Sequence, residues 1–501
     1  MVRHGGIAAC RNVGLRLVAF LLVGLLCTVP VRAASAQAPP LPLTPPPPEK
    51  GSLRIAVFNA ELTRRGPGVL LRDISQGRDP QVEAVVAVIA AARPDILLLA
   101  GFDTDLDGHA LAALRGQISR AGHPMDHAFG ALPNAGLSSG MDLDGDGRLN
   151  GPRDAQGYGA FHGAGGMALL SRLPLGSVTD LSPLRWAELP GARLPRRGGK
   201  LFPDEKAAQQ RRLSSVAHWL VPVPLPDGGR LMLMLYHAGP PVFDGPEDAN
   251  GLRNAEENRL WRLVLDGWAP SQTEGQLIGS GDLPVLAGIS NLDVRRGEGR
   301  RAAMAALLRH PRLRDARPAS AGAAAANSGA PNGEPALDTV DWPEEDAAGG
   351  PAPGNLRVAY VLPDARLRVT GAGVFWPAPQ PKAGGARDRG GRGWAEIVAT
   401  ASRHRLVWVD VAPSPPGASG PRRADISPLR GRVRGTTPGA GRVRPSLTPP
   451  AGRDTPSGDP FKEPATHEQP YPSDPSRRRH RPRSDDRGAP HHRLVRRQAR
   501  P

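Results

Sequence analysis

Polar side chains that can do chemistry follow apolar segments at several points along this 501-residue sequence. They are carboxylates, amides and imidazoles, namely Asn59, Glu61, Asp103, His237, Asn291, Asp293 and His404. Carboxylate and amide oxygens suit Mg²⁺ or Mn²⁺, and an imidazole can contact a phosphate group. If these side chains converge, they favour the attack of a positioned water molecule on a phosphate ester.

The segments before these side chains have the patterns of buried strands. Apolar runs of strand length occur at 53–62, 96–103, 166–175, 214–225, 230–239, 284–289, 355–363 and 404–411. Helical patterns lie at 79–94, 254–268 and 299–311, and Asp79 and Pro80 open the first of them. Because strands outnumber helices, we expect two sheets packed face to face with helices outside.

Seven of these segments, taken together, resemble the endonuclease/exonuclease/phosphatase superfamily, which has the deoxyribonuclease-I-like fold. In chain order they read FNAEL, PDILLLAGFD, GMALLSRLPL, LYHAG, GISNLD, NLRVAYVLP and SRHRLVWVDV. The resemblance implies a four-layered α/β sandwich of two mostly antiparallel sheets flanked by helices. It also implies Mg²⁺-dependent hydrolysis of a phosphate ester, in a divergent, exported member of bacterial type.

Four positions keep the residue types of the family. Asn59 matches the Asn of its first strand, His237 its mid-chain His, Asn291 the Asn of its GDxN corner, and His404 the His of its terminal SDH motif. The resemblance implies that Asn59 binds the metal, that Asn291 fixes the water, and that the two histidines hold the phosphate.

Three carboxylate positions of the family are replaced. Gly101 stands in place of the Glu of a Gln-Glu pair, Ile289 in place of the GDxN aspartate, and Ala359 in place of an aspartate beside a tyrosine. Loss of a general base costs a factor of about 10² to 10⁴ in rate. The other two losses would remove a metal ligand and the partner that orients His404.

Nearby acids could compensate for these losses. Side chains on a strand repeat every two residues, so Asp103 shares a face with Gly101, and Glu61 with Asn59. Asn59, Glu61 and Asp103 could then hold a divalent ion, with Asp293 approaching from a turn to help position the water. The alternative is that the three acids are exposed turn residues.

The stretch DLDGDGRLNGPRD at 142–154 follows the spacing of a calcium-binding loop. Its candidate Ca²⁺ ligands are Asp142, Asp144, Asp146 and Asn150. Gly147 fits the sharp turn of such loops, whereas Arg153 occupies the position of the final acid, with Asp154 one residue late. The stretch is therefore either a Ca²⁺ site or a surface turn rich in Asp and Gly.

A polar stretch at 239–254 directly follows His237 and ends near Arg253. It could form a lip that faces the substrate, with Arg253 as a phosphate contact. The alternative is an ordinary approach to the following helix.

The ends of the chain differ in composition from its body. Residues 1–36 have the arginine, apolar and small-residue regions of a signal peptide, which predicts a periplasmic or secreted protein, although a membrane anchor is an alternative. Residues 37–50 form a Pro-rich linker before the body at 51–411. Residues 412–501 carry 19 Lys and Arg against 8 Asp and Glu, and we expect this basic tail to be disordered.

The two cysteines, Cys10 and Cys27, lie in the segment predicted to be removed, so the mature protein needs neither a disulfide nor thiol chemistry. It is also expected to have no transmembrane segment. Two functions remain open. One is a metal-dependent hydrolase of phosphate esters, possible substrates including nucleic acid. The other is a catalytically degraded scaffold with a binding role, which would include calcium.

Overall fold

The computed structural model describes residues 43–413 apart from 227, 272, 274, 327–332, 344–352 and 380–392. The predicted signal peptide, most of the basic tail and the start of the linker lie outside the described residues. The end of the linker contacts the body, because the carbonyl of Pro46 accepts a hydrogen bond from Nη2 of Arg54. None of the helices in this part of the chain is both long and apolar enough to cross a membrane.

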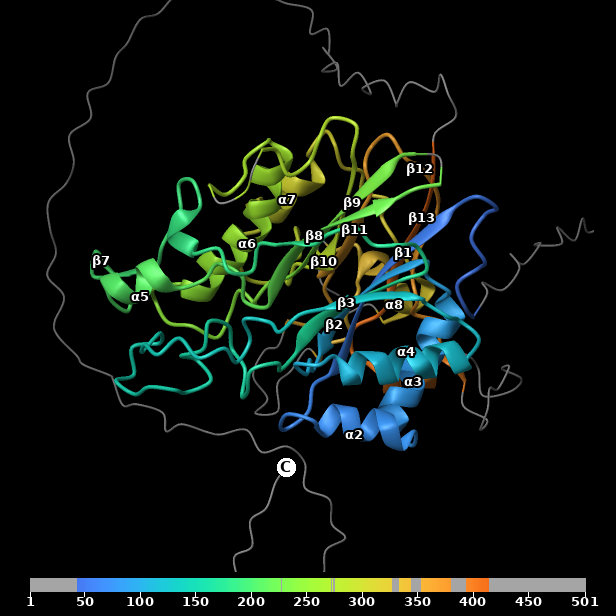
Figure 1. Ribbon diagram of the computed structural model, residues 1–501, viewed down its shortest axis with the longest axis horizontal. Helices are drawn as coiled ribbons and strands as arrows, with labels where there is room; N and C mark the ends of the chain where they lie inside the picture. The colour runs from blue at the N-terminus through green and yellow to red at the C-terminus, as the bar shows by residue number, and fades with distance from the viewer. Residues whose placement is uncertain are drawn as a thin grey trace, which may run out of the picture. The chain divides into compact units, whose positions relative to one another are not determined.

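The first sheet has six strands in the order β12-β13-β1-β2-β4-β3 (Figure 1). Their bounds are β1 Leu53–Leu62, β2 Ile96–Phe102, β3 His127–Gly130, β4 Gly166–Ser171, β12 Arg368–Val374 and β13 Val407–Ala412. In β1, Ile55 and Val57 belong to the apolar cluster between the sheets, whereas Ala56 and Phe58 pack with the helices. Both faces are buried, which explains the continuous apolar sequence of this strand.

The second sheet has five strands in the order β11-β10-β9-β8-β5. Their bounds are β5 Thr179–Asp180, β8 Ala217–Pro224, β9 Arg230–His237, β10 Leu283–Ile289 and β11 Ala359–Leu362. In the described strands, β1–β2 and β9–β10 pair in parallel and the other neighbours are antiparallel. A separate hairpin pairs β6 Arg196–Arg197 with β7 Lys200–Leu201.

Helices cover the outer face of each sheet (Figure 1). The helices α2 Val69–Gln76, α3 Pro80–Ala92, α4 His109–Arg120 and α9 Trp394–Ala401 pack on the six-stranded sheet. The helices α6 Ala249–Leu265 and α7 Ala302–Leu308 pack on the five-stranded sheet. Shorter helical segments are α5 Glu205–Gln210, α8 Ala321–Ala325, η1 Trp186–Glu188 and η2 Pro335–Leu337. The predicted four-layered α/β sandwich is confirmed.

Strand direction brings the predicted residues of the first sheet to one edge. The parallel strands β1 and β2 both end there, close to Asn59 and Asp103. Strand β13 runs antiparallel to β1, so His404 precedes β13 at the same edge. Asn59, Asp103 and His404 therefore lie at one edge because each stands at the end or the start of a strand.

The second sheet ends at the same edge. Strands β9 and β10 finish at His237 and Ile289, and β11 begins at Ala359 opposite Ile289. Thr339 connects the sheets here, because its carbonyl accepts the N–H of Arg405 before β13 and its hydroxyl accepts the N–H of Ala359. The edge is thus closed by strand ends from both sheets.

Candidate functional site

A β-bulge at the end of β1 places the side chain of Asn59 against β2. The register of the β1–β2 pair shifts between Asn59 and Leu62, and Gly101 in β2 has a φ of +62°. A Cβ atom at Gly101 would lie 2.2 Å from Oδ1 of Asn59. The amide of Asn59 therefore fills the space at position 101, where the family resemblance implies a glutamate.

Glu61 follows the bulge and turns its carboxylate to the loop before β13. Oε1 accepts bonds from Nε and Nη2 of Arg403, at 3.0 and 2.5 Å. Oε2 accepts the N–H of Arg403 at 2.8 Å and shares the hydroxyl of Ser402 at 3.0 Å. Burial raises the pKa of Glu61, but the Arg403 hydrogen bonds and the charges of His404 and Arg403 outweigh it, so the pKa is lowered overall.

Asp103 is buried and holds two loops together. Its Oδ1 accepts the N–H of Gly165 at 2.9 Å, and its Oδ2 accepts the N–H of Arg64 at 2.7 Å. Burial raises the pKa of Asp103 despite these two bonds. The carboxylate thus has a structural role at the end of β2.

Asp293 has a similar role after β10. It is buried, and its oxygens accept the backbone N–H groups of Arg295, Arg296 and Arg357. The last of these bonds, at 2.8 Å, ties the turn to the start of β11. Neither Asp103 nor Asp293 is an exposed turn acid.

His237, Ile289 and Ala359 form one row across β9, β10 and β11. Side chains directly opposite on neighbouring strands share a face, and Ile289 and Ala359 belong to the apolar cluster between the sheets. His237 therefore stands beside two apolar side chains at the positions where the family resemblance implies carboxylates. Burial lowers the pKa of His237 to about 3, and the nearby His404 adds to this effect.

His404 packs edge-on against Trp342, with ring centroids 5.5 Å apart. Its Nδ1 is buried and has no hydrogen-bond partner among the described residues. This orphaned nitrogen agrees with the loss of an orienting aspartate at Ala359. Burial lowers the pKa of His404 to about 4, although the charge of Glu61 opposes the shift, so the imidazole is neutral at pH 7.

Asn291 lies in the turn after β10 with a φ of +51°. Its Nδ2 donates to the carbonyl of Ala238 at 2.8 Å, which ties this turn to the end of β9. The edge thus gathers Asn59, Glu61, His237, Asn291 and His404, while their catalytic and metal-binding roles stay predictions.

Arg253, the predicted substrate contact, has partners inside the protein. Arg253 is buried in α6, and its guanidinium donates to backbone carbonyls of Gln156, Arg212, Leu213 and Ser214. It fastens α6 to the segment before β8, and these carbonyls use its hydrogen-bond donors. Helix α6 begins at Ala249, so most of the polar stretch that follows His237 precedes a helix in which several polar side chains are buried.

The predicted calcium loop brings its three aspartates together. One oxygen from each of Asp142, Asp144 and Asp146 lies within 4.8 Å of the others. Burial raises the pKa of Asp144, and the charges of Asp146, Asp154 and Asp142 add to it. Asn150, with a φ of +67°, accepts a long 3.4 Å bond from the Ser138 hydroxyl. A cation between the aspartates would relieve their repulsion.

Two residues at the edge were not predicted as site residues from the sequence. Arg403 occupies the middle of the Ser-Arg-His segment, where the family's SDH motif has an aspartate, and this charge reversal was visible in the sequence. Trp342 covers one side of His404, but nothing in the sequence signalled its contact with a residue 62 positions away.

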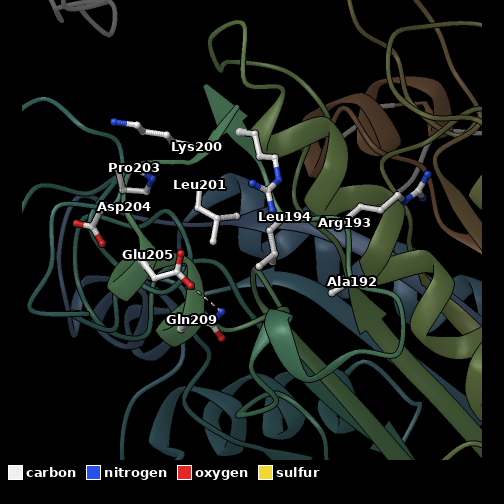
Figure 2. Close-up of a pocket in the computed structure, with 10 residues that line it drawn as sticks. Ala192, Arg193, Leu194, Lys200, Leu201, Pro203, Asp204, Glu205 and Gln209 are labelled. Carbon is white, nitrogen blue, oxygen red and sulfur yellow. Dashed lines mark hydrogen bonds between the residues drawn. The ribbon is translucent and has the colours of Figure 1, made fainter. Parts of the chain in front are cut away.

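A surface groove of about 920 Å³ lies elsewhere, between the β6–β7 hairpin and α5 (Figure 2). Basic and acidic side chains both line it, including Arg196, Lys200, Asp204 and Glu205. None of the predicted site residues lines this groove, so the converging strand ends remain the candidate site.

The fold and the site define a class: a two-sheet α/β sandwich with histidine and amide side chains at one edge. Residues 58–404 match the endonuclease/exonuclease/phosphatase family, and the chain belongs to this family. Membership of this family indicates that the chain has a scaffold of phosphodiesterase or nuclease type. No curated relative matches the chain.

Solved structures with the same fold are distant in sequence. An endonuclease/exonuclease/phosphatase from Beutenbergia cavernae is 17% identical, with a TM-score of 0.40 and coverage of 72% of each chain. The human Nocturnin catalytic domain with bound sulfate is 13% identical, with a TM-score of 0.38 and coverage of 74% of this chain and 97% of that one. D. rerio TDP2 complexed with a single-strand DNA product is 11% identical, with a TM-score of 0.35 and coverage of 72% and 98%.

The side chains at the edge do not fit the Mg²⁺ ion of the family. Mg²⁺ takes octahedral oxygen ligands that usually include one or two carboxylates. The carboxylate of Glu61 is filled by Arg403 and Ser402, and Asp103 accepts two backbone N–H groups. Asn59 uses its amide oxygen to accept the N–H of Glu61 at 3.3 Å. Both carboxylates are thus already paired with donors of the protein, and a metal ion that used the carboxylate of Glu61 would have to displace Arg403.

Proposed function

We propose that this protein is a non-hydrolysing member of its family, exported from the cytoplasm, that binds phosphate-ester ligands without the family's metal. The observation that carries the proposal is the apolar row at the end of the second sheet. Ile289 and Ala359, at two carboxylate positions, belong to the core between the sheets. The apolar row therefore lacks both the acid that would activate water and the acid that would orient His404.

The remaining side chains suit binding better than hydrolysis. Asn59, His237 and His404 are uncharged at pH 7, given the low pKa values of the two histidines. They can donate or accept hydrogen bonds to an ester, but they supply no charge for the transition state. Nucleic acid is one ligand of this chemical class.

Wild-type protein is expected to show no hydrolysis of DNA or of a chromogenic phosphodiester with Mg²⁺ or Mn²⁺, beyond the rate of a His404→Ala variant. A labelled oligonucleotide should still bind in EDTA, and His404→Ala should weaken this binding because it removes a hydrogen-bonding group. Product formation and fluorescence anisotropy measure the two effects. Metal-dependent hydrolysis that His404→Ala abolishes would refute the proposal.

We also propose Ca²⁺ binding by the loop at 142–154, because three aspartate oxygens gather there without a counter-charge between them. The ion would fix a long segment between β3 and β4, which leaves and rejoins the sheet at the edge of the candidate site. This second function is independent of hydrolysis.

Ca²⁺ is expected to raise the melting temperature of the wild-type protein, because a ligand that binds the folded state stabilises it. Asp144→Ala should remove the shift, since it deletes one ligand and part of the repulsion. Asp126→Ala, at an exposed aspartate outside the loop, is the matched control and should keep the shift. A Ca²⁺ response that is equal in all three proteins, or absent in the wild type, would contradict the loop site.

A further inference from the structure

We infer that Arg403 is a tethered cation that occupies, at the end of β1, the electrostatic position of a divalent metal. This inference deepens the proposed function and rests on it in one respect, the lack of a family-type metal site. It concerns how the negative charge of Glu61 is neutralised at the edge, whichever phosphate ester binds there.

The carboxylate of Glu61 needs a counter-charge where it lies. The backbone of Glu61 has a φ of +48°, which is strained for any residue other than glycine. The bulge therefore fixes the direction of the Glu61 side chain. The side chain of Glu61 is mostly shielded from solvent, and its oxygens lie against Arg403. An ionised, partly buried carboxylate is stable only with a partner that supplies both charge and hydrogen bonds.

Arg403 supplies the charge and three hydrogen bonds, and Ser402 lies beside the same carboxylate. A carboxylate has about four acceptor sites, two on each oxygen. Two guanidinium N–H groups donate to Oε1, and the backbone N–H of Arg403 donates to Oε2. The Ser402 hydroxyl shares its one proton between Oε2 and the carbonyl of Asn59. A metal ion would have to displace these donors to reach the carboxylate.

The same short loop also places His404. The Ser402 hydroxyl lies 2.8 Å from the carbonyl of Asn59 and accepts the N–H of His404 at 3.0 Å. The cation, the carboxylate and the imidazole are therefore set by one turn, which joins α9 to β13. An acid at position 403, as in the family's SDH motif, would lie beside Glu61 and repel it.

The replacements at the edge form a consistent set in charge. Carboxylates are absent at Gly101, Ile289 and Ala359, and a positive side chain stands at Arg403. One carboxylate and one guanidinium then remain at the end of β1 and cancel each other. An edge that kept a divalent metal would instead require several acids around it.

The test uses the full chain with Asp144→Ala, so that the calcium loop does not contribute. Melting is measured with and without millimolar Mn²⁺. We expect no Mn²⁺ shift in this background protein, a lower melting temperature after Arg403→Ala, and partial recovery of that loss by Mn²⁺. Glu61→Gln added to Arg403→Ala should abolish the Mn²⁺ recovery, because it removes the carboxylate that lost its partner when Arg403 was replaced.

Two comparisons keep the test decisive. Arg368→Ala breaks the exposed ion pair with Glu49 and is the matched control, so it should lower the melting temperature less than Arg403→Ala and show no Mn²⁺ recovery. If Arg403→Ala does not fold, Arg403→Gln, which keeps two N–H donors without the charge, takes its place.

The inference is overturned if Mn²⁺ stabilises the Asp144→Ala background protein in a manner that Glu61→Gln removes. It is also overturned if neither Arg403 variant responds to Mn²⁺. Hydrolysis by the wild type would refute the proposed function, whereas Mn²⁺ stabilisation through Glu61 without hydrolysis would refute this inference alone.

Discussion

Gly101→Ala is expected to destabilise the protein far more than an ordinary glycine replacement. The φ of +62° at this position costs an L-residue about 1–2 kcal/mol. The new Cβ would also lie 2.2 Å from Oδ1 of Asn59, and overpacking of this kind costs about 1–3 kcal/mol. Urea unfolding should therefore show a loss of roughly 2–5 kcal/mol in the free energy of unfolding.

Gly108→Ala is the matched control, because Gly108 has a φ of +70° but no atom within 4 Å of the place that a new methyl group would take. It should show the conformational cost alone. Asn59→Ala added to Gly101→Ala should recover part of the loss, since it removes the clashing amide. Equal losses for the two glycine variants would show that the Asn59 contact is not what restricts position 101.

This packing bears on the family's missing glutamate. A glutamate at position 101 would need both a different backbone conformation and a displaced Asn59. The backbone of the bulge is therefore adapted to glycine, and the site differs from the family's by more than a few side chains. A single substitution back to the family's residue would strain the edge rather than restore it.

Much of the fold could be predicted because local signals agreed with it. Helix α3 begins at Pro80 with the side chain of Asp79 accepting the N–H of Val82, as its sequence indicated. Apolar strands and their polar ends likewise marked the edge where Asn59, His237 and His404 meet. These features depend on residues that are close together in the sequence, so one sequence is enough to predict them.

The rest depends on partners that are distant in sequence. Glu61 was predicted as a metal ligand because it shares a strand face with Asn59. Nothing in the sequence indicated its bond with Arg403, which lies 342 positions away. Arg253 was predicted as a phosphate contact in the polar stretch after His237, yet it is buried, and four backbone carbonyls from outside α6 accept its hydrogen bonds. Buried polar contacts of this kind leave no periodic pattern in the sequence.

Buried histidines provide the second large effect, a dependence of stability on pH. Burial lowers the pKa of His218 to about 3 and that of His404 to about 4, from 6.5. Below pH 6.5 the unfolded chain binds a proton on each imidazole while the folded protein does not. The stability from these residues is thus present above pH 6.5 and is lost as the pH falls towards 4, by about 2 kcal/mol for each histidine at pH 5.

Other buried groups act in the opposite direction. Burial raises the pKa of Glu257 to about 7 and that of Asp338 to about 6, so the folded protein keeps protons that the unfolded chain has already released. Their stabilisation is present at low pH and is lost as the pH rises through these values. The pH profile of the wild type mixes both effects, and only a comparison of variants isolates one histidine.

The wild type is expected to lose unfolding free energy between pH 8 and pH 5. His404→Leu should reduce this loss by about 2 kcal/mol. Leucine cannot take up a proton in the unfolded chain, and it fills the buried position without an orphaned Nδ1. Urea unfolding at the two pH values gives the difference. Identical pH differences for wild type and His404→Leu would mean that His404 accepts a proton in the folded protein. The neutral imidazole on which the binding proposal depends would then be wrong.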